Sequence, residues 1–335
     1  MEALIFSANA VLPIIFLIVL GYCLKRIGML SKAFLDVGNR LTFRVLLPVM
    51  LFLNVYGIGR LQSVNAAFIV YGIGGVLVIF ALAVLVCCAF TKDAAKRGAL
   101  VQGVFRSNYA IIGIPLAASL YGGDGAAAAG IMSAFCVPVF NILGVIALTV
   151  FAPQENQHRL HDLNIRKMLR GIVTNPLIIG TVSGIAVLGI REVFGALGIG
   201  FRLSDLKPLY SAAESVRSLC TPFALIVLGG RFEFSAAANL RREIIFGTAL
   251  RTVAVPLLGL MGASLLRGPL GLTGAHFAVY VGVFATPVAV ASAIMAKEMG
   301  SDGELAGQLV IWTSLVSTVT VFLCVTVLRA AGLLS

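Results

Sequence analysis

The sequence predicts an all-α polytopic membrane protein with ten transmembrane helices, arranged as two inverted five-helix repeats. Composition gives the first observation: 59% of the 335 residues are hydrophobic, 12% are charged, and the mean hydropathy is +1.03. Soluble domains carry about 25% charged residues. The second observation is that apolar runs of about 20 residues, enough to cross a ~30 Å hydrocarbon core, recur along the chain. The third is an internal repeat of glycine-containing motifs.

Ten apolar runs define the predicted spans. The first repeat holds five of them, at residues 4–24, 37–56, 66–90, 98–120 and 126–151. The second repeat holds the other five, at residues 174–190, 212–230, 244–266, 275–296 and 305–328. Because five is an odd number, the two repeats must cross the membrane in opposite orientations. We therefore expect repeats at residues 1–151 and 174–335, joined by a linker at residues 152–173.

The repeat is visible in two short motifs that end hydrophobic runs. The sequence GGDG closes one run at residues 122–125, and GSDG closes another at residues 300–303, 178 positions later. At the same spacing Asn108 falls opposite Thr286. Each motif follows a run that carries polar residues and contains glycine or proline, which predicts an interrupted helix. Interrupted helices in corresponding positions of two halves indicate the binding site of a secondary transporter.

The distribution of cations sets the predicted orientation. The net charge is +11 and the pI is near 9.7, which in a soluble protein would suggest a nucleic-acid partner. Here the loops after odd-numbered spans hold 14 Lys and Arg residues, and those after even-numbered spans, with the C-terminus, hold 6. Positively charged loops stay in the cytoplasm. We therefore expect a multi-pass protein of the cytoplasmic (inner) membrane, with both termini outside, the linker inside and no nucleic-acid partner.

Span four carries an arginine at membrane depth. Counted from Arg97, Arg106 lies about 13 Å along the helix, close to the bilayer midplane. An arginine at this depth costs about 2.5–3.5 kcal/mol on insertion scales, and intramembrane cations usually mark a substrate or ion pathway. The alternative is that Arg106 snorkels or binds carbonyl groups freed by a helix break. Arg251 is a second candidate whose role the sequence leaves open.

Proline and glycine predict that spans four and nine are interrupted and cross. Pro115 removes a backbone donor and Gly113 permits unwinding, while Thr286 and Pro287 begin a run of small residues that lets another backbone approach. Two helix N-termini aimed inward contribute about 0.3–1 kcal/mol each toward an anion. Charge-assisted hydrogen bonds raise the sum to about 4–6 kcal/mol, or near-millimolar affinity. The candidate substrate-binding residues are Arg106, Ser107, Asn108, Tyr109, Pro115, Thr286, Pro287 and Ser292.

The acidic residues give the complementary observation. All fourteen lie in loops or near helix ends, which gives little support for a proton relay or a carboxylate-lined sodium site. Backbone carbonyls at a helix break can still hold sodium, so H⁺ and Na⁺ both stay open as coupling ions. We expect no catalytic residues, metal site or cofactor, because His158, His161 and His276 lie in loops or near a helix end and zinc needs further converging ligands.

Residues of spans four and nine carry a resemblance to a known family. Residues 108–116 (NYAIIGIPL), with Tyr121 and Gly122 after them, resemble the auxin efflux carrier family, which includes plant PIN-type carriers and bacterial permeases associated with organic acids. Pro287, followed by AKE at residues 296–298, stands at the spacing of the plant carriers. The resemblance covers essentially the whole chain.

The resemblance implies the NhaA, BASS and PIN-like fold, with broken helices four and nine crossing. It implies a scaffold of spans one, two, six and seven, a transport unit of spans three to five and eight to ten, and a homodimer built on the scaffold. A substrate carboxylate would bind at the crossing, where Asn108 and Pro115 are crossover residues. The plant carriers have a second crossover proline at the position of Ser292. In span six, Gly180 and Gly184 form a GxxxG pattern, which favours close helix packing within a chain or at a dimer contact.

The predicted function is transport of a small organic anion, such as a dicarboxylate or an auxin-like acid, by a secondary active or facilitative carrier that works by alternating access. Two other classes stay open. A channel would show unsaturated conductance, whereas a carrier shows saturable flux and counterflow. An intramembrane enzyme is less favoured, because the chain has no His-Glu-x-x-His sequence and Asp124 is preceded by Tyr-Gly-Gly.

Overall fold

The structure, a computed structural model, describes residues 2–57, 65–152, 173–232 and 234–334, so residues 153–172 of the expected linker, with His158 and His161, lie outside the described residues. Apart from one isolated β-bridge, the regular elements of the described residues are helical. The first half contains α1 (Glu2–Arg26), α2 (Lys32–Leu41), η1 (Thr42–Leu46), α3 (Leu47–Tyr56), α4 (Ala66–Phe90), α5 (Ala94–Phe105), η2 (Tyr109–Gly113) and α6 (Ile114–Val150). The second half contains α8 (Pro176–Ala196), η3 (Leu203–Asp205), α9 (Lys207–Gly230), α10 (Phe234–Asn239), α11 (Arg241–Ala249), η4 (Leu250–Ala254), α12 (Val255–Leu265), α13 (Gly274–Tyr280), η5 (Val281–Ala285), α14 (Ala291–Glu298) and α15 (Gly303–Ala330).

Helices occupy every apolar run that the sequence marks as a span. Among the described residues, six helical stretches are both long and apolar enough to cross a membrane, at residues 66–90, 109–150, 176–196, 207–230, 241–265 and 303–330. Large apolar side chains on their outer faces are exposed, among them Val70 at 69% and Leu85 at 67%. Soluble monomers rarely expose contiguous apolar surface of this kind. The outer faces of these helices are therefore suited to lipid.

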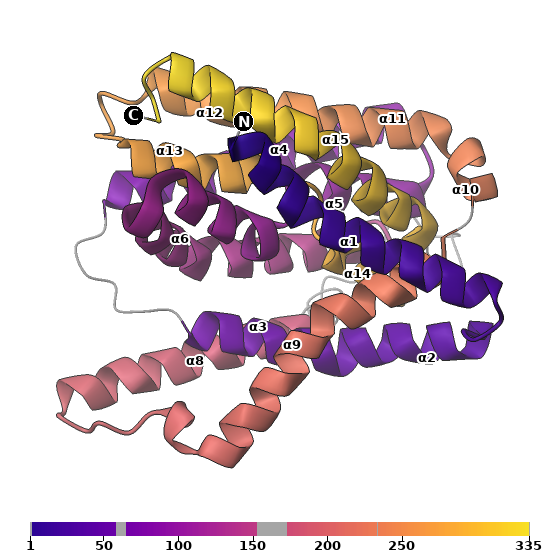
Figure 1. Cartoon of the computed structure of the whole chain (residues 1–335), viewed down its shortest axis with the longest axis horizontal. Coiled ribbons are helices and arrows are strands. Elements are labelled where there is room, and N and C mark those ends of the chain that lie inside the picture. The colour runs from indigo at the N-terminus through magenta and orange to yellow at the C-terminus, as the bar shows by residue number, and fades with distance from the viewer. Residues whose placement is uncertain (1, 58–64, 153–172, 233, 335) are drawn as a thin grey trace, which may run out of the picture.

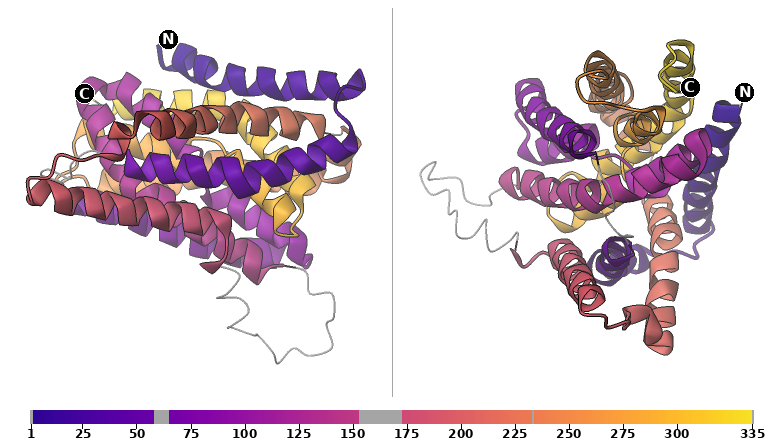
Figure 2. Two further views of the ribbon diagram at one scale, coloured as in Figure 1. Left: turned by 90° about the horizontal axis from the view of Figure 1, so that it is seen from below. Right: turned by 90° about the vertical axis from the view of Figure 1, so that its left-hand side faces the viewer.

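The helices form two groups with α1 lying along their boundary (Figures 1 and 2). One group contains α2, α3, α8 and α9, and the other contains α4 to α6 and α11 to α15. Helix α1 packs on α9 from the first group and on α15 from the second. The start of α1 and the end of α15 lie at one end of the bundle, opposite the turn between α1 and α2 (Figure 1).

The GxxxG pattern of α8 mediates helix packing within the chain. A Cβ atom on Gly180 would lie 2.5 Å from the carbonyl oxygen of Pro48, and one on Gly184 would lie 2.9 Å from that of Phe52. Both neighbours belong to α3, so the two glycines let α8 and α3 approach closely. Of the two alternatives left open by the sequence, this face serves packing within the chain.

Each of the four π-type turns among the described residues precedes a proline. The turns η1, η2, η4 and η5 end two residues before Pro48, Pro115, Pro256 and Pro287. A proline lacks the N–H donor and its ring clashes with the carbonyl group one turn earlier. A wider turn relieves this clash. The helix continues after η1, η2 and η4, whereas an extended segment follows η5. Span four therefore continues as a helix through Pro115, and its break lies at residues 106–108 rather than at Gly113 and Pro115.

The first glycine of each repeated motif has a positive φ. Gly122 has a φ of 59° and kinks α6, and Gly300 has a φ of 74° just after α14. Both values lie in the left-handed region, which glycine adopts without steric cost. The kink at Gly122 marks the expected boundary between spans four and five. In the second motif Asp302 caps α15 by accepting a hydrogen bond from the backbone N–H of Leu305 (2.9 Å).

Candidate functional site

Two extended segments interrupt helices and pair with each other. We call residues 106–108, between α5 and η2, and residues 286–289, between η5 and α14, the crossing segments. Ser107 and Val288 form an antiparallel bridge. The N–H of Asn108 donates to the carbonyl of Pro287 (2.8 Å), and the N–H of Ala289 donates to the carbonyl of Arg106 (3.2 Å). Two interrupted helical stretches thus meet at these residues, held by backbone hydrogen bonds.

Two glycines let the flanking turns of this crossing touch. Gly113 lies in η2 and Gly282 lies in η5. A Cβ atom on Gly113 would lie 3.0 Å from the carbonyl oxygen of Gly282, and one on Gly282 would lie 2.9 Å from the carbonyl oxygen of Gly113. Such contacts are shorter than ordinary van der Waals distances, so both positions favour glycine.

A cavity of about 60 Å³ borders the crossing. Three buried polar atoms in its lining have no hydrogen-bond partner among the described residues: Ser107 Oγ, Asn108 Nδ2 and Asn141 Nδ2. An unsatisfied buried polar group costs about 1–3 kcal/mol. Each of these groups can donate a hydrogen bond. The cavity is therefore lined by donors that lack acceptors, which is the arrangement that suits an anion.

Arg106 also lines this cavity and is only 3% exposed. Its Nη2 donates to Asn141 Oδ1 (2.6 Å), and its Nη1 contacts the sulfur of Met295. With the Gln102 amide turned to satisfy its surroundings, Gln102 Oε1 accepts from Arg106 Nη1 (3.2 Å) and Gln102 Nε2 donates to the Ser292 carbonyl (3.1 Å). All these partners are neutral, and the ion pairs of the described residues do not include Arg106. The guanidinium is always protonated in proteins, so its charge is uncompensated here.

Two helix N-termini face the same cavity. Tyr109, Ala110 and Ile111 begin the helical segment after the first break, Val290 and Ala291 lie at the start of α14, and all five residues line the cavity. The first N–H groups of a helix have no partner within it, and the helix dipole makes this end positive. Helix N-termini are favourable places for anions. Their potential has the same sign as the charge of Arg106.

Arg251 has a different environment, although it is also fully buried. It lies in η4, and its guanidinium donates to backbone carbonyls of Thr286, Val283, Val104 and Phe105. These carbonyls belong to the ends of the helices that stop at the two crossing segments. Arg251 thus has the carbonyl-binding role that the sequence offered as an alternative for Arg106.

The eight candidate residues are divided by the structure into cavity lining and support. Arg106, Ser107, Asn108 and Tyr109 line the cavity. Tyr109 directs its hydroxyl away, to the carbonyl of Ala129 (3.0 Å). The others lie outside the lining: Thr286 and Pro287 provide carbonyls to Arg251 and Asn108, Ser292 is buried behind Gln102, and Pro115 is exposed at the start of α6.

Sequence reasoning missed Asn141, Gln102 and Met295, which surround the guanidinium of Arg106. The available signal for Asn141 was a single amide in the apolar run from 126 to 151. A polar residue inside a span usually faces the interior of the bundle. For Gln102, its spacing of four residues before Arg106 would place both on one helix face.

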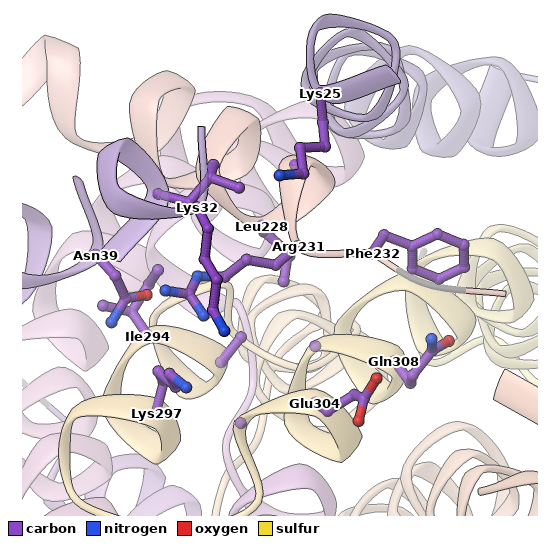
Figure 3. A pocket seen from close by; sticks show the side chains of 15 residues that line it. Lys25, Lys32, Asn39, Leu228, Arg231, Phe232, Ile294, Lys297, Glu304 and Gln308 are labelled. Carbon is purple, nitrogen blue, oxygen red and sulfur yellow. The ribbon is translucent and has the colours of Figure 1, made fainter. Parts of the chain in front are cut away.

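A second, larger pocket of about 490 Å³ opens at the end of the bundle where α1 meets α2 (Figure 3). Its lining brings together four cations from separate elements: Lys25, Lys32, Arg231 and Lys297. Among the residues that line this pocket, Glu304 carries a carboxylate. Arg231 pairs with Asp36, and this hydrogen bond holds the pKa of Asp36 below its usual value. The lining thus holds more cations than carboxylates, and the pocket carries a net positive charge.

The two pockets follow one seam between α9 and α14. The cavity at the crossing is lined by Ala224 of α9 and Ala291 of α14, and the basic pocket by Leu228 and Ile294, about one helical turn further along each helix. Beside this seam, Asn39 Nδ2 of α2 donates to Glu298 Oε1 of α14 (2.6 Å). The hydrogen bond ties the first group of helices to the second.

The chain is similar to known membrane transport proteins. A family model described as membrane transport protein matches residues 6–325. An uncharacterized transporter from Methanothermobacter thermautotrophicus is 23% identical to the chain over 320 residues, which cover 94% of this chain and 96% of that relative. Both matches include the two crossing segments and both halves of the chain.

Proposed function

The chain belongs to the membrane transport protein family, the auxin efflux carrier family that its motifs resemble, and from this premise we propose that it carries a small organic anion across the cytoplasmic membrane by alternating access. The observation that carries the proposal is the uncompensated charge of Arg106 beside unpartnered donors on Ser107, Asn108 and Asn141. A carboxylate offers the acceptors that these groups lack.

The cavity bounds the size of the anion. One water needs about 10–15 Å³ by this measure of volume, so a cavity of about 60 Å³ has room for a few non-hydrogen atoms. A carboxylate with a short chain fits in this conformation, and a larger acid requires the two groups of helices to separate. We therefore favour small mono- and dicarboxylates over an auxin-like acid.

Alternating access would move the helices around the crossing against the scaffold. In this proposal α1, α2–α3, α8 and α9 form the scaffold, and the remaining helices form the transport unit. Ten spans in two inverted repeats, at residues 1–151 and 174–335, account for the two crossing segments and for the left-handed glycines 178 positions apart. They also account for the two chain ends lying at one end of the bundle (Figure 1).

The basic pocket is the proposed entrance from the cytoplasm. Predicted cytoplasmic loops provide Lys25, Lys32, Arg231 and Lys297, which surround it (Figure 3). A cleft lined by one sign of charge raises the local concentration of the opposite ion. An anion gathered there lies about one helical turn from the cavity along the α9 and α14 seam. Transport then requires α14 to move away from α9 and α2, which breaks the bond between Asn39 and Glu298.

A channel is the second candidate, and counterflow separates it from a carrier. Purified protein in proteoliposomes preloaded with an unlabelled dicarboxylate should accumulate the labelled acid transiently and with saturation. A preceding thermal-shift screen against mono- and dicarboxylates identifies the acid, since ligands of the folded state raise its stability. Flux that rises linearly with concentration and shows no counterflow would reject alternating access. If no carboxylate in the screen binds, the proposal that the substrate is a small organic anion is rejected.

A further inference from the structure

The guanidinium of Arg251 occupies a cage of backbone carbonyl oxygens. Its Nε and Nη2 donate to Thr286 O (2.9 and 2.6 Å), and Nη2 also donates to Val283 O (3.3 Å). Its Nη1 donates to Val104 O (3.1 Å) and Phe105 O (3.3 Å). The side chain is 0% exposed, and the ion pairs of the described residues do not include it. One side chain therefore joins the two helix ends that lead into the crossing segments, through neutral oxygens.

The electrostatic potential at these oxygens is negative because of where the helices end. Helix α5 stops at Phe105 and η5 stops at Ala285, so the last carbonyls of each have no N–H from a following turn. Each helix end also carries about half a negative charge from its dipole. In transporters with broken helices, such freed carbonyls coordinate a coupling cation. Here a covalently attached cation already fills the position.

We propose that Arg251 is a tethered substitute for a coupling cation, so that anion binding at the crossing is independent of Na⁺ and of other alkali cations. The proposal rests on the proposed transport function and concerns the same crossing. Arg251 balances the negative ends of the two broken helices from one side and leaves the opposite, positive side free for the anion. It acts on the anion through the crossing segments, as a positioning residue.

Without the Arg251 side chain, the cage of carbonyl oxygens would be empty. Replacing Arg251 by alanine leaves the oxygens of Val104, Phe105, Val283 and Thr286 around a space without a cation. Hard cations prefer oxygen ligands of this kind. Sodium should therefore restore, at least in part, what the variant loses.

The test compares wild-type protein, Arg251→Ala and Arg251→Lys in nanodiscs, in NaCl, LiCl or choline chloride of equal ionic strength. Melting temperature and carboxylate binding are measured on each preparation. For wild-type protein, neither the melting temperature nor the carboxylate affinity should differ between the three salts. The same should hold for Arg251→Lys. In Arg251→Ala the melting temperature should rise and saturate with sodium concentration, and anion affinity should be about 5- to 150-fold higher in sodium than in choline, the usual range for two coupled sites.

Thr252→Val serves as the matched control. Thr252 is buried beside Arg251, and its hydroxyl bonds only to the carbonyl of Thr248 in its own helix (2.8 Å). This variant should show no difference between salts. The proposal is overturned if wild-type anion binding requires sodium, or if folded Arg251→Ala melts at the same temperature in all three salts. If Arg251→Ala does not fold in any salt, Arg251→Gln provides the neutral side chain. Failure of both neutral variants to fold with sodium present also rejects the proposal, because sodium should then replace the lost charge.

The melting experiment needs no substrate. Sodium-dependent stability of Arg251→Ala without any carboxylate binding would reject the anion proposal and leave the role of Arg251 standing. Carboxylate binding that is sodium-dependent in wild-type protein would reject the proposed role of Arg251 and leave the anion proposal standing. The two failures are therefore distinguishable.

Discussion

Replacing Arg106 tests the anion site most directly. The alanine variant removes the guanidinium that lines the cavity and bonds to Asn141 Oδ1 at 2.6 Å. A hydrogen bond to a charged group is worth about 1.5–3 kcal/mol. Loss of such a bond between the Arg106 guanidinium and the bound carboxylate should weaken carboxylate affinity about 10- to 150-fold, since about 1.4 kcal/mol corresponds to a factor of ten. Asn108→Ala should also weaken binding, because Asn108 Nδ2 is one of the unpartnered donors of the cavity.

A lysine at position 106 refines the test. The guanidinium of Arg106 holds several partners at once through its planar fork, and an ammonium group cannot reproduce this geometry. Arg106→Lys should therefore recover only part of the affinity. Arg44→Ala is the matched control, because Arg44 also lies in a span but is exposed and outside the lining of the cavity. It should bind the carboxylate like the wild-type protein.

The assay measures ligand binding and melting temperature on the same purified, membrane-inserted preparations. A lower melting temperature with unchanged affinity in Arg106→Ala would mean that Arg106 only supports the fold. The contacts argue against that outcome, because Arg251 rather than Arg106 bonds the carbonyls freed by the breaks. Unchanged affinity in both Arg106→Ala and Asn108→Ala would refute the anion site.

Three further predictions concern topology, assembly and the crossing. A cysteine at Gln157, outside the described residues, should react with an impermeant thiol reagent only from the cytoplasmic face in a background without native cysteines; labelling from outside intact cells would reverse the orientation. Mass measurement in mild detergent or nanodiscs should give a homodimer, and monomer alone would contradict it. Gly282→Ala should lower the melting temperature, because its Cβ would lie 2.9 Å from Gly113 O, whereas Gly74→Ala, where a Cβ meets nothing within 4 Å, should not.

The helical spans were predictable because the bilayer requires long apolar runs, and the structure places helices in each of them. The exact position of the break in span four was not predictable from the sequence. Proline and glycine marked residues 113 and 115, but the widened turn of η2 accommodates Pro115, and the chain unwinds at Arg106 instead. Whether a proline ends a helix depends on the packing of the preceding turn, which single-residue propensities do not contain.

The candidate site was predictable as far as residues adjacent in sequence could define it. Arg106, Ser107 and Asn108 were identified because polar residues are expensive in a membrane. Asn141 was missed since one amide in an apolar helix does not reveal which neighbour it faces. The role of Arg251 also depended on partners that lie 32 to 147 positions away in the chain, and depth in the membrane alone does not distinguish it from Arg106.

The division of labour between the two buried arginines follows from the ends of the helices that they face. Arg251 faces the C-terminal ends of α5 and η5, where carbonyls and dipoles are negative, so its charge is compensated in place. Arg106 shares its cavity with the N-terminal ends of η2 and α14, where the potential is already positive, and its protein partners are neutral. A cation placed beside positive helix ends is unfavourable unless an anion joins it. The crossing therefore has a positive potential on one side only, and under the proposed function this asymmetry would let it bind and release an anion.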